Sequence, residues 1–276
     1  MDERGLGKQL QAARLAAGLT QQQLCHRANL SFSTLTKIER GAIKAPSIFT
    51  IRAIAGALGV SLDDLVGHRL MSLKTKGGAR FIYFDVNGCL IYFWQHAFDK
   101  LAADTGVGTE AIESAFWRYN DEVCRGDLSV DEFNRKLAKQ IGVPSVDWLD
   151  YYLESVEPIH EMQQLLVQAS ERYQVGLLTN TMPGLVESML ENKQLPVLHY
   201  GAIVDSSQVG AIKPEKKIYE IAQQRTGCPS DEILLIDDNN ANLVAASHFG
   251  WHVLWFDDSR LSESIKRVAE ALEPTA

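Results

Sequence analysis

The sequence is poor in cysteine, and its cysteines lie far apart. The four residues, Cys25, Cys89, Cys124 and Cys228, form no Cys-x-x-Cys pair. Zinc sites and disulfide frameworks depend on regularly spaced cysteines, so neither is expected. Because free cysteine is among the most frequently buried residue types, we predict that all four are reduced packing residues.

Long apolar runs, internal repeats and low-complexity tracts are also absent. No apolar stretch approaches the roughly 18 residues that span a bilayer, and the opening MDERGLGKQL lacks the apolar core of a secretion signal. Hydrophobic residues make up 46% of the chain and charged residues 22%, as in ordinary globular proteins. We therefore expect a folded, cytoplasmic protein with no membrane partner.

Positive charge is scarce in the whole chain and unevenly distributed. Residues 1–70 carry nine Lys or Arg against five Asp or Glu, whereas residues 71–276 carry 18 against 30. A contact with nucleic acid is therefore expected from the first 70 residues. At 276 residues the chain is also long enough for two domains.

The N-terminal part of the sequence predicts five short helices and no strand. Gly18 is placed to end the first helix, Thr20 to cap TQQQLCHRA, and Ser31 to cap SFSTLTKIER. SIFTIRAIAGALG and SLDDLVG supply the last two helices. We place an all-α domain at residues 1–68 and a Lys- and Gly-containing linker at residues 69–79.

Two of these helices, joined by the short turn NL, have the geometry that presents a helix to the DNA major groove. The stretch from GLTQQQL to SLDDL resembles the phage-repressor helix-turn-helix family (Cro and C1 type, XRE family). The residues that match this family are Gln21, Ile38-Glu39-Arg40-Gly41 and Pro46-Ser47. The alternative is that the bundle is only a dimerisation or protein-docking module.

The resemblance implies a homodimer on operator DNA, with half-sites about 34 Å apart. It also implies two sets of DNA contacts. The residues expected to face base edges are Phe32, Ser33, Thr34 and Lys37. Those expected to contact phosphates are Gln21, Arg40 and Lys44.

The remainder of the sequence predicts a doubly wound α/β domain at residues 80–276. Four short apolar runs, RFIYFD, QVGLLTN, EILLID and HVLWF, alternate with helical patterns, which is typical of a parallel sheet with crossover helices. Between the first two runs lies a long helical insert, roughly Trp94 to Val156. It is too long for a crossover, so we interpret it as a cap at about residues 92–157.

Polar residues follow the predicted strands of this domain, where open parallel sheets bind ligands. They are Asp85 after the first strand, Thr179 and Asn180 at the second, Lys213 in a following loop, and Asp237, Asp238 and Asn242 at the third. A carboxylate nucleophile, a hydroxyl, a cation and a carboxylate pair suit phosphoryl transfer through an aspartyl-phosphate. A hard cation such as Mg²⁺ takes oxygen ligands of this kind.

The order and spacing of these segments resemble the haloacid dehalogenase superfamily over about residues 80–260, with its small helical cap type. GDLSVDEFNRKL in the insert looks like a stretch common in sugar-phosphate phosphatases of that branch. The resemblance implies that Asp85 is both nucleophile and metal ligand, with the Asn87 carbonyl as a second ligand. Asp238 would bind the metal, with Asp237 beside it.

The resemblance also assigns the phosphoryl group its partners. Thr179 and the Asn180 amide would hold the phosphoryl oxygens, while Lys213 would neutralise charge and orient Asp85. Four residues of the cap could contact the substrate, although an aromatic stripe at helical spacing is more often part of a core; they are Trp94, Trp117, Arg118 and Tyr119. Cys89 is expected to be a packing residue, and His248 and His252 to be structural.

Asn87 departs from the family pattern, in which most phosphatases place a second Asp there as general acid and base. Asn cannot donate a proton, and losing such a group costs about a hundred- to ten-thousand-fold in rate. Two functions remain open. The protein is either a regulator that hydrolyses a small phosphorylated metabolite, or one whose silent domain binds such a ligand or accepts a phosphate on Asp85. Ligand at the cap interface is expected to shift operator affinity.

A third hypothesis is an enzyme that anchors at nucleic acid and acts on a terminal phosphate. The acidic character of the cap disfavours a polyanionic substrate of this kind.

Overall fold

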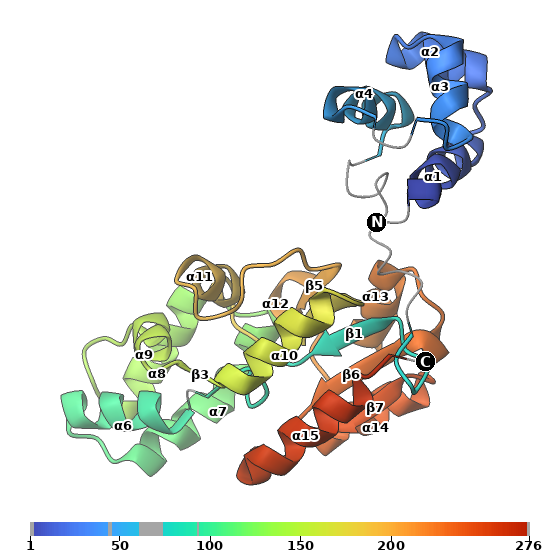
Figure 1. Ribbon diagram of the computed structural model, residues 1–276. Coiled ribbons are helices and arrows are strands. Elements are labelled where there is room, and N and C mark those ends of the chain that lie inside the picture. Colours follow the sequence, from blue (N-terminus) through green and yellow to red (C-terminus); the bar gives the residue numbers. More distant parts are fainter. Residues whose placement is uncertain (1–2, 44–45, 61–73, 93, 275–276) are drawn as a thin grey trace. The chain divides into compact units, whose positions relative to one another are not determined.

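The computed structural model describes residues 3–43, 46–60, 74–92 and 94–274. The chain divides into two units, Met1–Leu70 and Met71–Ala276, and Figure 1 shows a helical first unit and a second unit built on a sheet. This confirms the predicted class, an all-α domain followed by an α/β domain.

The first unit contains four of the five predicted helices, and the fifth prediction, over residues 61–67, lies outside the described residues. The helices are α1 (Glu3–Ala16), α2 (Gln21–Ala28), α3 (Phe32–Glu39) and α4 (Ile48–Leu58). Thr20 caps α2 through a capping box with Gln23, and Ser31 caps α3 by accepting the Thr34 N–H. These side chains satisfy backbone donors that a helix start leaves unpaired, which is why the helices begin where the sequence predicts.

The helices of this unit pack around a small apolar core. Leu10, Leu24, Leu35 and Ile54 are fully buried in it. Helix α1 approaches the end of α3 so closely that a Cβ on Gly7 would lie 2.4 Å from the Ile38 carbonyl oxygen. Glycine at this position is therefore required by the helix contact.

A buried carboxylate ties three of the helices together. Arg14 Nε donates to Glu39 Oε1 at 2.7 Å and Arg14 Nη2 to Oε2 at 3.2 Å, which makes a bidentate pair. Gln21 Nε2 also donates to Glu39 Oε2, at 2.7 Å. Arg14 and Glu39 are only 6% and 7% exposed, so water could not solvate either charge if its partner were removed.

In the second unit, five parallel strands form one sheet in the order β5-β4-β1-β6-β7. They are β1 (Phe81–Phe84), β4 (Gln174–Thr179), β5 (Ala202–Asp205), β6 (Ile233–Asp237) and β7 (His252–Trp255). The four predicted strands are confirmed. Strand β5, with the sequence AIVD, was not predicted; periodicity alone does not distinguish so short an apolar run from a piece of buried helix.

Side chains alternate between the two faces of this sheet. Ile82 and Phe84 of β1 pack in a large core cluster, whereas Phe81 and Tyr83 pack in a second one. Helices α10 (His160–Ser170) and α15 (Leu261–Ala271) contribute to the first cluster. Helices α13 (Lys216–Thr226) and α14 (Asn240–His248) contribute to the second. Both faces of the sheet are thus covered (Figure 1).

The insert forms the expected helical cap, set apart from the sheet in Figure 1. Its helices are α6 (Trp94–Thr105), α7 (Thr109–Arg125), α8 (Val130–Ile141) and α9 (Trp148–Glu154). A short antiparallel ribbon of β2 (Ile91–Tyr92) and β3 (Glu157–Pro158) connects the cap to the core, and it was not predicted. Phe116 stands at the centre of the cap, with ring centroids 4.7 to 5.7 Å from Phe98, Phe133 and Trp148.

Replacing Glu39 by Gln should destabilise the first unit by about 3 to 5 kcal/mol, because Arg14 would remain buried without a countercharge. Differential scanning calorimetry of the full chain should show a lower Tm for the transition that does not respond to Mg²⁺. Lys37→Gln, on the exposed side of the same helix, serves as the control and should shift stability by less than about 0.5 kcal/mol. Equal effects of the two substitutions would contradict the role given to Glu39.

Candidate functional sites

Helix α3 carries the residues predicted to read DNA, and its buried side consists of Leu35, Ile38 and Glu39. Ser33, Lys37 and Arg40 are exposed, and their spacing of four and three residues places them on one helical face. Phe32 begins the helix and is 50% exposed. Four of the seven predicted DNA contacts are therefore open to solvent.

The remaining three predicted contacts differ in placement. The Thr34 hydroxyl lies 2.7 Å from Ser31 Oγ, so it takes part in capping the helix. Gln21 is half-buried, and its amide donates to Glu39 inside the domain rather than pointing outward. Lys44 lies outside the described residues.

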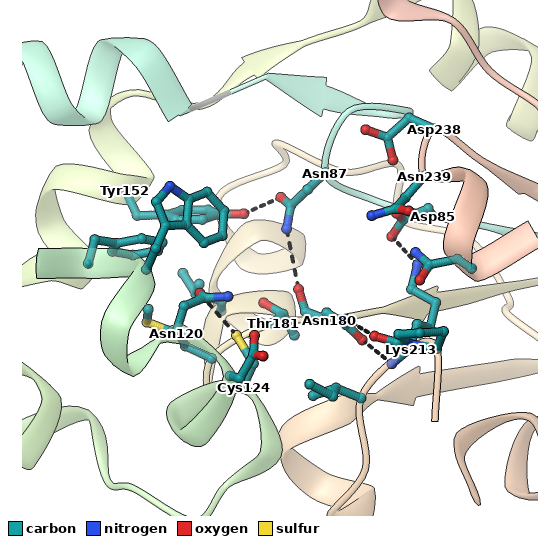
Figure 2. Close-up of a pocket in the computed structure, with 18 of the residues that line it drawn as sticks. Asp85, Asn87, Asn120, Cys124, Tyr152, Asn180, Thr181, Lys213, Asp238 and Asn239 are labelled. Atoms are coloured by element: carbon teal, nitrogen blue, oxygen red, sulfur yellow. Dashed lines mark hydrogen bonds and ion pairs between the residues drawn. The ribbon is translucent and has the colours of Figure 1, made fainter. Parts of the chain in front are cut away.

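In the second unit, the polar residues predicted from the strand ends, with the exception of Thr179, meet in one place. Asp85 follows β1, Asn180 and Thr181 follow β4, and Asp238 follows β6. Figure 2 shows Asp85, Asn87, Asn180, Lys213 and Asp238 around one pocket. The sheet topology accounts for this, because β4, β1 and β6 are neighbours and parallel strands end at the same edge.

Lys213 is the centre of this cluster. Its Nζ lies 2.8 Å from Asp85 Oδ1 and 2.7 Å from Asp237 Oδ2. Asp237 is fully buried and also accepts from Asn242 Nδ2, at 3.0 and 3.1 Å, and from the Asn239 N–H at 2.8 Å. The oxygens of Asp237 are thus largely taken up in holding Lys213.

The cluster holds more negative charge than Lys213 can balance. Asp85, Asp237 and Asp238 each offer an oxygen, and the three oxygens lie within 4.8 Å of one another. Burial, followed by the effect of neighbouring carboxylates, raises the pKa of Asp85 to about 8, although Lys213 opposes the rise. The same causes raise the pKa of Asp238 to about 6. Once all three carboxylates are ionised, the single ammonium leaves an excess of two negative charges, which a divalent cation would offset.

The donor set therefore fits a hard cation such as Mg²⁺, which prefers a few carboxylate oxygens. Because Asp237 already accepts from Lys213, Asn242 and Asn239, Asp85 and Asp238 are the carboxylates better suited to hold it. Gly88, which sequence analysis did not single out, makes room for Asp238. A Cβ on Gly88 would lie 2.3 Å from Asp238 Oδ2, and the Gly88 φ of +81° also favours glycine.

Asn87, which replaces the expected second Asp, is held by the cap. The Tyr152 hydroxyl in α9 donates to Asn87 Oδ1 at 2.5 Å, and Asn87 Nδ2 donates to the Asn180 carbonyl oxygen at 3.4 Å (Figure 2). Because a carbonyl oxygen can only accept, the amide NH₂ must face Asn180. Burial raises the pKa of Tyr152 well above its usual range, which keeps the hydroxyl protonated as the donor.

A cavity of about 300 Å³ joins this cluster to the cap. Its walls include residues that sequence analysis did not select, namely Asn120, Asp121, Cys124, Trp148, Tyr152, Thr181, Met182 and Leu185. Thr181 lines the cavity, whereas Thr179 does not. Thr179 is fully buried, and its hydroxyl has no hydrogen-bond partner among the described residues.

The cap and the core are fastened together beside this cavity. Ser206 Oγ donates to the Cys124 carbonyl oxygen at 2.5 Å and accepts the Thr181 N–H at 2.9 Å. The next residue of α7, Arg125, forms an ion pair with Glu215 at 2.6 Å. The end of α7 is therefore fixed against the loop that follows β4.

The comparisons agree with both units. Residues 10–65 match the family model described as "Helix-turn-helix". Over 66 residues the chain is 42% identical to an immunity repressor protein of Bacillus phage phi105, which covers 24% of this chain and 45% of the repressor. The first unit is thus a helix-turn-helix domain.

Residues 93–256, more than half of the chain, match the family model "Haloacid dehalogenase-like hydrolase". The chain belongs to the haloacid dehalogenase-like hydrolase family. It is 28% identical over 83 residues to an (S)-2-haloacid dehalogenase of Pseudomonas fluorescens, covering 30% of this chain and 36% of that enzyme. These two curated relatives are thus each spanned over less than half of their length.

A solved haloacid dehalogenase-family enzyme from Bacteroides thetaiotaomicron, in complex with magnesium, shares the fold of this family member. The TM-score is 0.56 at 21% identity, over 64% of this chain and 93% of that enzyme. Within the described residues, no helix has the length and apolar character needed to cross a membrane.

Cys89, His252 and His248 lie outside the lining of the cavity in this haloacid dehalogenase-like domain. Cys89 is fully buried among apolar side chains, as expected of a packing residue. His252 is exposed, and its Nε2 lies 2.8 Å from the Asp231 carbonyl oxygen; His248 ends α14. Trp117, by contrast, is 45% exposed and lines the cavity, so it is not the core residue that its helical spacing favoured.

Arg118 and Tyr119, considered with Trp117, are not among the described residues that line the cavity. Arg118 is exposed, and Tyr119 is half-buried against the core. The side chain of Trp94 lies outside the described residues.

Mg²⁺ should stabilise the second unit more at pH 8 than at pH 6. The raised pKa values mean that Asp85 and Asp238 hold protons near pH 6, and those protons must leave before a cation binds. Without Mg²⁺, stability should fall as pH rises through these folded-state values, because ionised buried carboxylates repel one another. Tm measured with and without Mg²⁺ across this range checks both trends. Equal Mg²⁺-induced shifts at the two pH values, or no loss of the trend in Asp85→Asn, would contradict this site.

Proposed function

We propose that the protein is a cytoplasmic, homodimeric transcriptional regulator whose second domain hydrolyses a small phosphate monoester through an aspartyl-phosphate. The observation that carries the proposal is the buried cluster in which Lys213 bridges Asp85 and Asp237, with Asp238 alongside. Such a constellation combines a fixed nucleophile with a charge excess that suits a divalent cation. A magnesium complex of a structurally similar enzyme supports the same metal.

The reaction follows from the contacts of Asp85. Lys213 and the Val86 N–H both donate to Asp85 Oδ1, which leaves Oδ2 as the oxygen able to attack phosphorus. The Oδ2–P bond forms as the ester P–O bond breaks, and water then attacks phosphorus to release phosphate and restore Asp85. Bound Mg²⁺, held by Asp85 and Asp238, would offset the negative charge that develops on the phosphoryl oxygens.

Asn87 sets the character of this hydrolysis. It can donate a hydrogen bond through Nδ2 but has no proton to transfer, so the leaving oxygen must take its proton from water. Esters with acidic leaving groups should therefore react far better than alkyl esters.

The second candidate function is a sensor domain that binds a phosphorylated ligand, or carries a phosphate on Asp85, without turnover. The observation that favours it is the Tyr152–Asn87 hydrogen bond, which fixes a group unable to act as an acid. In either case we propose that the ligand changes operator affinity. This requires the ligand to prefer one of two arrangements of the protein.

Steady phosphate release from p-nitrophenyl phosphate with Mg²⁺, lost in Asp85→Asn, is the expected result for an enzyme. Asn87→Asp restores a general acid and should raise the rate on alkyl phosphates by about a hundredfold or more, with a smaller gain on p-nitrophenyl phosphate. Tyr152→Phe in the Asn87→Asp background controls for loss of the cap contact. Absence of release above background, together with Mg²⁺-dependent beryllofluoride binding that requires Asp85, would favour the sensor instead.

DNA binding should decrease with salt, and Lys37→Ala should reduce the slope of log affinity against log salt by about one, because one positive charge on the DNA-facing side of α3 is lost. Fluorescence anisotropy with a random-sequence duplex measures this slope. Lys139→Ala, an exposed lysine in the cap helix α8, is the matched control and should leave the slope unchanged. A salt slope insensitive to Lys37 would favour the docking-module alternative for the first domain.

A further inference from the structure

The cavity beside Asp85 is short of positive charge. Among the described residues that line it, Lys213 is the single cationic side chain, and Asp85 and Asp237 both accept from it at 2.7 to 2.8 Å. The cap adds a carboxylate to this wall, Asp121, which is exposed. A second anionic group on a ligand would therefore find no countercharge and would meet like charge.

The neutral polar part of the cap wall is suited to hydrogen bonding. Asn120 Oδ1 accepts from Cys124 Sγ at 3.5 Å, so its amide NH₂ is the part of the side chain able to donate to a ligand. Asp121, by contrast, can only accept once ionised. A ligand hydroxyl group can donate to Asp121 and accept from the Asn120 amide, whereas a ligand ammonium group can only donate, to Asp121.

Size and shape restrict the ligand further. A volume of about 300 Å³ lies at the lower end of the range for ligand-binding pockets, which suits a small ester better than a large one. The aromatic side chains of Phe116, Trp117 and Trp148 line the cavity and suit the C–H faces of such an ester.

We propose that the site selects phosphate monoesters whose small body donates hydrogen bonds and bears no second negative charge. The inference rests on the proposed phosphomonoester site and names its substrate class. Bisphosphates, nucleoside polyphosphates and phosphorylated carboxylic acids are excluded by the charge of the wall.

The test compares two esters of the same carbon number, glycerol 3-phosphate and 3-phosphoglycerate, on the full chain with Mg²⁺. The expected kcat/KM ratio is at least about tenfold in favour of glycerol 3-phosphate, because the carboxylate of the other ester meets Asp121. Phosphoethanolamine, as a third ester, distinguishes an ammonium body from a hydroxyl body. Asp121→Lys should lower the ratio by at least about tenfold. Asp131→Lys, exposed on the same cap but away from the cavity, should leave it unchanged.

Binding separates this inference from the proposed hydrolysis. Calorimetric titration of Asp85→Asn with the same two esters and Mg²⁺ should show the same preference without turnover. A preference in binding, with no hydrolysis by the unmodified protein, would uphold the substrate class and reject the enzyme. Equal kcat/KM values and equal affinities for the two esters overturn the inference even if both esters are hydrolysed. Failure to bind both esters also overturns it.

Discussion

The second domain depends on one buried ammonium group among three carboxylates. Lys213 is 3% exposed and can remain charged only because Asp85 and Asp237 surround it, while Asn242 and the Asn239 N–H fix Asp237 in turn. Removing one partner from such a group leaves an uncompensated buried charge, which costs several kcal/mol. The arrangement therefore fixes Asp85 in place while leaving the excess negative charge that suits a cation.

The helix-turn-helix domain is held together in a similar way on a smaller scale. Glu39 is buried at the end of α3 and accepts from Arg14 in α1 and Gln21 in α2. These contacts lie on the buried side of α3, whereas Ser33 and Lys37 lie on its exposed side. In both domains a buried charge network positions the groups proposed to bind the ligand or the DNA.

The cap adds contacts to the cluster of polar residues at the strand ends. Tyr152 reaches Asn87 from α9, and Ser206 joins the end of α7 to the loop after β4. Asn87 is thereby fixed with its NH₂ toward the Asn180 carbonyl oxygen, and the Tyr152 hydroxyl donates to its amide oxygen. The charge of the cap wall, set by Asp121, then bears on which esters are accepted.

The two-domain organisation, the helix caps at Thr20 and Ser31, and the meeting of Asp85 and Asp238 at one sheet edge could all be predicted from the sequence. These features follow from local rules, because caps act within one helical turn and parallel strands all end on the same side. Three further contacts became evident only in the folded chain: Gln21 turns inward to Glu39, Gly88 makes room for Asp238, and Tyr152 donates to Asn87. Those contacts join residues from 18 to 150 positions apart, whose pairing depends on how the helices and the cap pack and leaves no periodic signal in the sequence.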